Sequence, residues 1–319
     1  KMITPLAAGV LSFLIDGSRT LLFAGTRSSG KTSLLGSALV EIMRKYRIIS
    51  IEDTLEIPVD ALRNLGYNIQ PMKVRSALLA GGGEVTADEG IRTSLRMGDS
   101  SLIIGEIRSV EAKALFESMR IGALANVVAG TIHGAHPYAV YDRVVNDLQV
   151  PKTSFKAVDI IIVSNPVKTA DGLRSSKRVL QITEVRKHWL DDPQAEGGFA
   201  DLFTYDSIQD ALVPTDTLLH GESEILKSIA GTVREWAGNW QAVWDNILLR
   251  ANIKETLVRL SEEQHLPELL EASFVVQSND QFHKISEDIR EETGRLDSNL
   301  IFASWQDWLN RMIKSQQIT

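Results

Sequence analysis

The sequence contains no cysteine, which excludes disulfide bonds and metal sites built from thiolates and fits a reducing compartment. No apolar run approaches the roughly 20 residues that a membrane-spanning helix requires. The first residues lack the pattern of a signal peptide, but the sequence starts with Lys1 instead of methionine, so we expect a natural segment to precede it. What remains is an ordinary globular composition, and a length of 319 residues suggests about two domains.

The net charge of −7 is unevenly distributed along the chain. Residues 1–190 carry 24 Lys and Arg against 18 Asp and Glu, whereas residues 191–319 carry 10 against 23. All six tryptophans lie at or beyond Trp189, beside the linker-like segment Asp191–Gly198. We therefore predict a first domain of residues 1–190 and an acidic, mainly helical second domain of residues 191–319.

Two further patterns support this division. In the second part, Trp236, Trp240 and Trp244 recur every four residues, which is the spacing of a helix face packed into a core. In the first part, apolar strand-like segments alternate with amphipathic helical ones, which is typical of an α/β fold with a mostly parallel sheet. The strand-like segments are residues 20–24, 47–51, 67–74, 101–105, 126–132, 157–167 and 178–189, and the helix-like ones are residues 31–46, 86–97, 109–123 and 137–148.

The segment Gly25–Thr32 reads Gly-Thr-Arg-Ser-Ser-Gly-Lys-Thr and matches the phosphate-binding pattern G-x-x-x-x-G-K-[ST]. A predicted strand precedes it and a predicted helix follows it. The glycines let backbone N–H groups turn toward phosphate oxygens, the lysine reaches the β- and γ-phosphates, and the threonine hydroxyl takes a magnesium position. We expect a RecA-like core that binds a nucleoside triphosphate through Gly25, Thr26, Arg27, Ser28, Ser29, Gly30, Lys31, Thr32 and Ser33.

Three more motifs follow the loop, each at the end of a predicted strand. They contribute the carboxylates of residues 52, 53 and 56, the Glu106 and Arg108 pair, and the imidazole of His133. The carboxyl ends of parallel strands converge on one crevice, so these groups should meet beside the triphosphate. Each also has a plain structural alternative, since an acid can cap a helix and a lone histidine can simply form hydrogen bonds.

Together these motifs resemble the secretion-motor ATPase superfamily of type II secretion, type IV pilus, archaellum and type IV secretion systems, and in particular its archaeal members. The Walker A motif of that family corresponds to Gly25–Thr32, its acidic box to Ile51–Pro58, its atypical Walker B motif to Leu102–Arg108 and its His box to Gly130–Gly134. The resemblance covers about residues 3–190. It departs from the family where Leu55 and Asp99 replace common prolines and where no tetracysteine metal domain is present.

The resemblance implies a cytoplasmic ATPase that uses ATP and Mg²⁺. Glu56 would polarise the attacking water, with Glu52 in support, and His133 would sense the γ-phosphate. The magnesium ligands would come from Thr32, Glu106 and Asp53. Arg92, Arg96 and Arg108 are candidates for stabilising charge across a subunit interface, although ion pairs with Asp88, Glu89 or Asp99 are an alternative explanation for them.

The resemblance also implies a hexameric ring at the inner face of the membrane, acting on a polytopic platform protein to assemble a pilus-like filament or to secrete protein. The family's N-terminal domain would precede Lys1. A nucleic-acid translocase is the main alternative, but the basic clusters at residues 44–47 and 174–178 are short, and no specific nucleic acid is expected. A small-molecule kinase would leave Glu106 and His133 without a role, and a scaffold that does not hydrolyse ATP would not need Glu56.

Overall fold

The computed structural model describes residues 2–74, 86–94, 96–109, 111–120, 126–169 and 171–315. The chain forms two compact units. The sheet unit comprises Lys1–Ile3, Gly17–Ser37 and Arg44–Ile225, and the helical unit comprises Thr4–Asp16, Ala38–Met43 and Leu226–Thr319. We describe each unit by itself.

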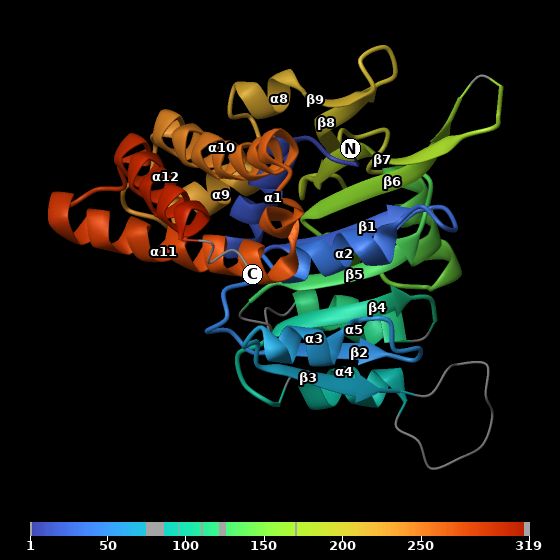
Figure 1. The fold of residues 1–319 in the computed structure, drawn as a ribbon. Helices are drawn as coiled ribbons and strands as arrows, with labels where there is room; N and C mark the ends of the chain where they lie inside the picture. The colour runs from blue at the N-terminus through green and yellow to red at the C-terminus, as the bar shows by residue number, and fades with distance from the viewer. Residues whose placement is uncertain are drawn as a thin grey trace. The chain divides into compact units, whose positions relative to one another are not determined.

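In the described part of the sheet unit, nine strands form one sheet in the order β3-β2-β4-β5-β1-β6-β7-β8-β9 (Figure 1). The pairs among the first six strands of this order are parallel, and the last three strands are added antiparallel. The strands are β1 Thr20–Gly25, β2 Ile48–Glu52, β3 Ile69–Lys73, β4 Ser101–Ile107, β5 Val128–His133, β6 Ile160–Lys168, β7 Ser175–Val185, β8 Phe199–Asp206 and β9 Ala211–Pro214.

Helices connect the parallel strands and lie on both faces of the sheet, which confirms the predicted fold class (Figure 1). Helix α4 shows how the sequence sets an element: the Thr86 hydroxyl accepts from the Glu89 amide at 3.2 Å, and the Glu89 carboxylate accepts from the Thr86 amide at 3.0 Å, as a capping box requires. The helices of this unit are α2 Lys31–Leu39, α3 Val59–Asn64, α4 Ala87–Ser94, α5 Glu111–Arg120, α6 Pro137–Asp142, the π-helix Arg143–Asp147, α7 Lys152–Phe155 and α8 Asp216–Leu219.

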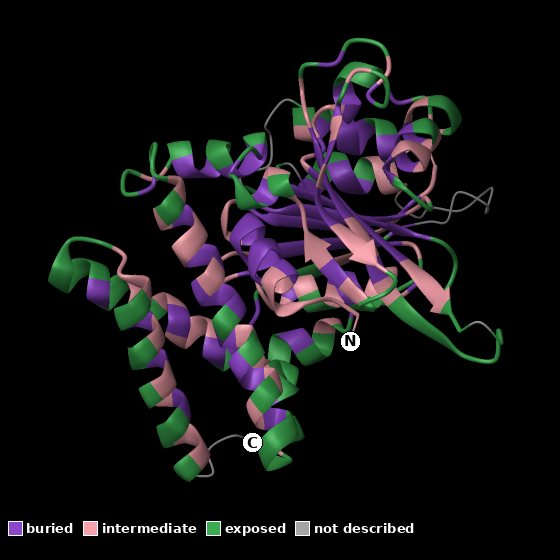
Figure 2. Cartoon of the chain, turned by 90° about the horizontal axis from the view of Figure 1, so that it is seen from above, coloured by how far each residue is buried: buried purple, intermediate pink, exposed green. Residues whose placement is uncertain are grey.

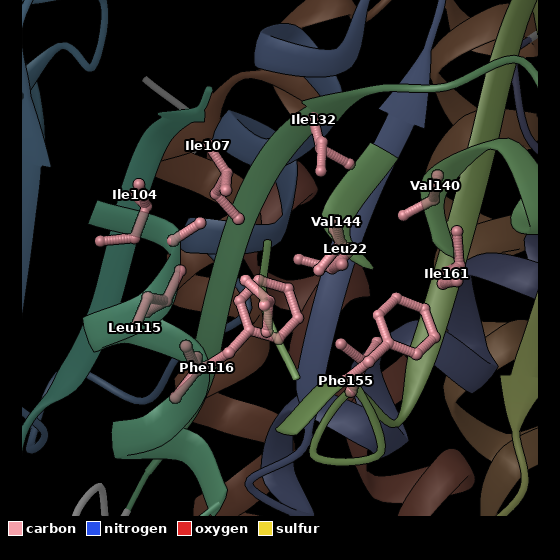
Figure 3. Packing of buried hydrophobic residues seen from close by; sticks show 14 of the residues in the cluster. Leu22, Ile104, Ile107, Leu115, Phe116, Ile132, Val140, Val144, Phe155 and Ile161 are labelled. Carbon is pink, nitrogen blue, oxygen red and sulfur yellow. The ribbon is translucent and has the colours of Figure 1, made fainter. Parts of the chain in front are cut away.

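One face of the sheet is covered by α5, α6 and α7. Figure 3 shows Leu22, Ile132 and Ile161 of the strands facing the rings of Phe116 and Phe155, whose centroids are 6.2 Å apart. Strands β1 and β2 are buried along their whole length, in keeping with the purple of the sheet in Figure 2, because helices cover both faces of a parallel sheet and keep water away from it. This packing gives the carboxyl ends of the strands a rigid base.

The charge shift near residue 190 does not coincide with the division between the two units. Strand β8 pairs with β7 in the same sheet, so the segment Asp191–Gly198 is a loop between neighbouring strands. The Glu196 carboxylate orders this loop by accepting the amides of Leu190, Asp191 and Asp192 at 2.7 Å each. These bonds hold the pKa of Glu196 below its ordinary value. The acidic composition here comes from a hydrogen-bonded turn, and the sheet unit continues to Ile225.

The helical unit contains a core of its own in which Trp305 is fully buried and donates to the Ser278 hydroxyl at 3.2 Å. Trp236 precedes α10, which starts at Trp240, so the three spaced tryptophans do not form one helical stripe. Among the described residues, no helix is both long enough and apolar enough to cross a membrane. The helices are α1 Pro5–Asp16, α9 Glu224–Gly231, α10 Trp240–Gln264, the 3-10 helix Pro267–Leu270, α11 Ala272–Thr293 and α12 Ser298–Lys314.

Candidate nucleotide site

The loop between β1 and α2 has the backbone geometry of a phosphate cradle. Gly25 lies so close to β6 that an added Cβ would be 2.0 Å from the Ser164 carbonyl oxygen, so no side chain fits there. Gly30 has φ +90°, a conformation that favours glycine. The Lys31 ammonium donates to the carbonyls of Gly25 at 3.2 Å and Thr26 at 2.8 Å. These two bonds hold the lysine ammonium group against the first residues of the phosphate loop.

Burial lowers the pKa of Lys31, and the charges of Glu106 and Glu56 partly oppose that shift. The two carboxylates come from different strand ends, β4 and the loop after β2, yet both act electrostatically on the same ammonium group. Both carboxylates therefore belong to the electrostatic surroundings of Lys31.

Glu52, the last residue of β2, supports the acidic loop, which is the segment of residues 53–58 that carries Glu56. Its side chain is buried, and its Oε1 accepts from the amides of Glu56 at 2.9 Å and Ile57 at 3.1 Å. The carboxylate packs against Gly105, where an added Cβ would lie 2.9 Å from the Glu52 Cγ. Burial raises the pKa of Glu52, although the two backbone bonds oppose the shift. Glu52 therefore fixes the backbone that carries Glu56, while the Glu56 side chain itself is exposed.

A chain of charged groups links β2, β4 and β5. Arg108 forms ion pairs with Asp53 and with Glu106, and the second Glu106 oxygen lies 3.0 Å from the His133 Nε2. The pairing of β4 with β5 shifts register between Ile104 and Ile107, so a bulge lies where the Glu106 side chain leaves the strand. Bulges of this kind re-aim side chains beside active sites.

The remaining predicted residues occupy the surface. Arg92 pairs with Asp88 at 3.0 Å, which agrees with the alternative explanation that this arginine forms a surface ion pair. Arg96 is exposed, and within the described ranges its side chain makes no ion pair. Arg108 differs from both because its partners are the carboxylates of the site itself. In the phosphate loop, Ser29 is buried, whereas the side chains of Thr26, Arg27, Ser28 and Ser33 are exposed.

Sequence reasoning missed the two β6 residues that brace the phosphate loop. The Ser164 hydroxyl lies 3.3 Å from that of Ser29. The Asn165 side chain accepts from the Thr26 amide at 2.9 Å and donates to the Ala135 carbonyl at 3.1 Å. The only sequence signal is a polar Ser-Asn-Pro run at the end of an apolar strand, which is equally typical of a turn.

The donor set fits a magnesium nucleotide. Thr32 lies in the first turn of α2, beside the loop amides, and Glu106 supplies a carboxylate near Lys31. Mg²⁺ in such sites is held by one or two protein groups together with substrate phosphates, so a complete protein cage is not needed. Asp53 is less available because its two oxygens already accept from the Thr54 amide and pair with Arg108.

Comparisons with known proteins agree with these motifs. A model of the type II/IV secretion system protein family matches residues 4–182, over half of the chain. An uncharacterised protein of Methanocaldococcus jannaschii is 30% identical over 230 residues, which are 72% of this chain and 78% of that protein. The VirB11 protein of Agrobacterium fabrum is 28% identical over 176 residues, 55% of this chain and 49% of VirB11.

Among solved structures, the VirB11 ATPase from the Brucella suis type IV secretion system aligns with a TM-score of 0.43 and 21% identity, covering 55% of this chain and 50% of that one. The chain thus spans about half the length of the VirB11 proteins that it matches. The family match includes the phosphate loop, the acidic loop, Glu106 and His133. The chain belongs to the type II/IV secretion system protein family.

Proposed function

We propose that this chain hydrolyses ATP and is the motor subunit of a secretion or pilus-type machine. The observation that carries the proposal is a loop whose geometry suits phosphates, together with Glu106, which pairs with Arg108 and lies 3.0 Å from His133. Lys31 and the loop amides hold the β- and γ-phosphates. Thr32 and Glu106 would hold Mg²⁺, which would supply charge neutralisation at the transferred phosphoryl group, and Asp53 would join them only after releasing Arg108.

Glu56 polarises the attacking water. Glu52 fixes the Glu56 backbone through the 2.9 Å bond, and the exposed Glu56 carboxylate is accessible to a water beside the nucleotide. His133 reports on the γ-phosphate through its 3.0 Å contact with Glu106. Loss of the γ-phosphate changes the charge around Glu106, and the hydrogen bond between Glu106 and the His133 imidazole can change in response.

The motor function requires several copies of the chain. We propose a hexameric ring at the inner face of the membrane, which acts on a polytopic platform protein. Arg96 is exposed and makes no ion pair within the described ranges, so it is available to a neighbouring nucleotide, whereas Arg92 would first have to leave Asp88. Arg108 instead organises the acidic groups of its own site. Family membership supports this proposal.

The water-polarising role is tested by Glu56→Gln, which keeps the shape of the side chain and removes its basicity. ATP hydrolysis should fall by about 10²-fold or more while ATP binding persists, because general-base contributions are commonly about 10²–10⁴-fold. Asp60→Asn is the matched control, since Asp60 is an acid of the next helix with 96% of its side chain exposed. An unchanged rate in Glu56→Gln would remove Glu56 from the mechanism.

The ring and its partner need a second experiment. Particle images with a non-hydrolysable ATP analogue should show a closed ring in which an arginine reaches the neighbouring nucleotide. ATP hydrolysis should be stimulated by the membrane platform protein or by anionic lipid. Stimulation by DNA that declines steeply with salt would instead favour a nucleic-acid translocase.

A further inference from the structure

Asn165 connects two segments of the candidate site that are far apart in the sequence. Its Oδ1 accepts from the Thr26 amide at 2.9 Å, and its Nδ2 donates to the Ala135 carbonyl at 3.1 Å. Because Thr26 can only donate and Ala135 can only accept through these backbone groups, the orientation of the Asn165 amide is fixed. Both ends of the side chain are therefore used, and each end holds a different loop.

The two loops are the start of the phosphate loop and the segment that follows β5. Thr26 is the second residue of the phosphate-binding pattern, and Ala135 comes two residues after His133. A weaker backbone bond, from the Gly134 amide to the Gly25 carbonyl at 3.4 Å, joins the same two segments. Asn165 reinforces this connection from a third strand, β6, which pairs directly with β1.

This connection lies next to the groups expected to respond to the γ-phosphate. His133 contacts Glu106 at 3.0 Å on one side, and the backbone after His133 is tied to Thr26 through Asn165 on the other. A displacement of the backbone after β5 is therefore transmitted through Asn165 to Thr26, at the start of the phosphate loop. Both bonds of Asn165 are exposed to solvent, so each adds only modestly to stability, and their effect is to fix the position of the three segments relative to one another.

We propose that Asn165 is a positioning residue that keeps the phosphate loop in register with His133, so that His133 and the loop act as one unit during ATP hydrolysis. This inference rests on the proposed function. Asn165 touches neither Glu56 nor the Lys31 ammonium among the described contacts, so it acts through the backbone of Thr26 and Ala135.

The test compares steady-state ATP hydrolysis and ADP affinity for Asn165→Ala. We expect kcat to fall roughly tenfold to a hundredfold, because small misplacements of positioned groups have effects of this size, while the Kd for ADP changes less than about threefold. Asn146→Ala is the matched control, since Asn146 also donates a side-chain bond, to Asp142 at 2.6 Å, but touches neither the phosphate loop nor Ala135 among the described contacts. The control should keep the wild-type rate.

A double-mutant cycle separates positioning from general weakening of the fold. If Asn165 acts through His133, then Asn165→Ala should add little to the loss already caused by His133→Asn. Asn165→Asp provides a second variant of the same size, which keeps the acceptor for Thr26 but loses the donor to Ala135, and its kcat should also fall. Additive losses in the cycle, or an Asn165→Ala enzyme with wild-type kcat, would overturn the inference.

ATP hydrolysis by the wild-type protein distinguishes a failure of the proposed function from a failure of the role assigned to Asn165. Wild-type protein that hydrolyses ATP, together with additive or absent effects at Asn165, would contradict this inference alone. Wild-type protein without any hydrolysis would contradict the proposed function and this inference with it.

Discussion

The two carboxylate oxygens of Glu52 have different surroundings. Oε1 accepts the amides of Glu56 and Ile57, whereas Oε2 is buried and has no hydrogen-bond partner within the described ranges. A negative charge on a buried oxygen without a hydrogen-bond partner costs free energy, which agrees with the raised pKa that burial gives Glu52. The same side chain therefore positions the acidic loop and destabilises the fold when it is charged.

Glu52→Gln should remove this pH dependence. The raised folded pKa means that the folded protein holds a proton on Glu52 where the unfolded chain, with an ordinary value of 4.5, has already lost it. Wild-type stability relative to Glu52→Gln should thus decline as the pH rises above about 4.5 and through the folded pKa. Urea unfolding at several pH values measures this difference.

Glu52→Ala provides the contrast, because it leaves both loop amides without their acceptor. We expect a loss of roughly 1–3 kcal/mol together with slower ATP hydrolysis. If Glu52→Gln and wild type showed the same pH profile, the carboxylate would not be under the strain that its burial suggests.

At this scale, the sequence predicts residues that belong to short motifs. Lys31, Glu56 and Glu106 were assigned from three such motifs, and their roles stay predictions, while Glu106 lies 3.0 Å from the His133 imidazole and pairs with Arg108. Asn165 was missed because it is 139 residues from Thr26 and its role exists only once β6 lies beside β1. No local pattern can encode a partner that is supplied by strand order.

Among the elements, β7 shows how a buried carboxylate can anchor a helix. Glu184 is fully buried, and it accepts from the Ser223 hydroxyl, from the Glu224 amide at 3.0 Å and from the Ile225 amide at 3.1 Å. These groups lie at the first turn of α9, whose amides would otherwise be unsatisfied. A strand residue thus performs the task that a local capping residue usually has.

Glu184→Ala should lower the free energy of unfolding by about 3 kcal/mol, because it leaves buried donors without an acceptor. Glu196→Ala is an instructive comparison, since Glu196 also accepts three backbone amides but is only half-buried, and water can replace it. Thermal or urea unfolding should therefore show a much smaller loss for Glu196→Ala. Equal losses would contradict the importance of burial.

Most strands of the first 190 residues follow the predicted alternation because period and capping signals are local, but helices α1 and α3 were not predicted and α2 ends at Leu39, before the predicted end at residue 46. Strands β8 and β9 escaped prediction because the acidic turn before β8 resembles a linker in composition. Only its hydrogen bonds to Glu196 reveal that it joins two strands of one sheet. A truncation after residue 198 would therefore remove two strands of the sheet unit.

For the whole molecule, the helical unit contains a buried charge cluster that gives its stability a pH dependence. Arg250 on α10 donates to Asp16 on α1 at 2.5 Å, and His283 on α11 lies 3.6 Å from the same Asp16 oxygen. Burial lowers the pKa of His283, and Arg250 acts in the same direction, against the opposing charges of Asp16, Glu41 and Asp280.

Stability should therefore fall as the pH drops below the ordinary histidine value of 6.5 and through the lower folded pKa, since the unfolded chain then binds a proton that the folded chain resists. His283→Gln should flatten this decline, whereas the same change at the exposed His220 should not. Unfolding followed between pH 7 and pH 5 tests the prediction. A steeper decline in His283→Gln would reverse the assigned sign.

The central claim is that the site around Lys31 hydrolyses ATP. Phosphate release from Mg²⁺-ATP by wild type and by Lys31→Ala tests it most directly, with Lys284→Ala, an exposed lysine of α11, as the control. We predict steady hydrolysis by wild type and by the control, and a loss of about 10²–10³-fold in Lys31→Ala, the size expected when a group that stabilises transition-state charge is removed. Equal rates in wild type and Lys31→Ala, or no hydrolysis by wild type, would contradict the claim.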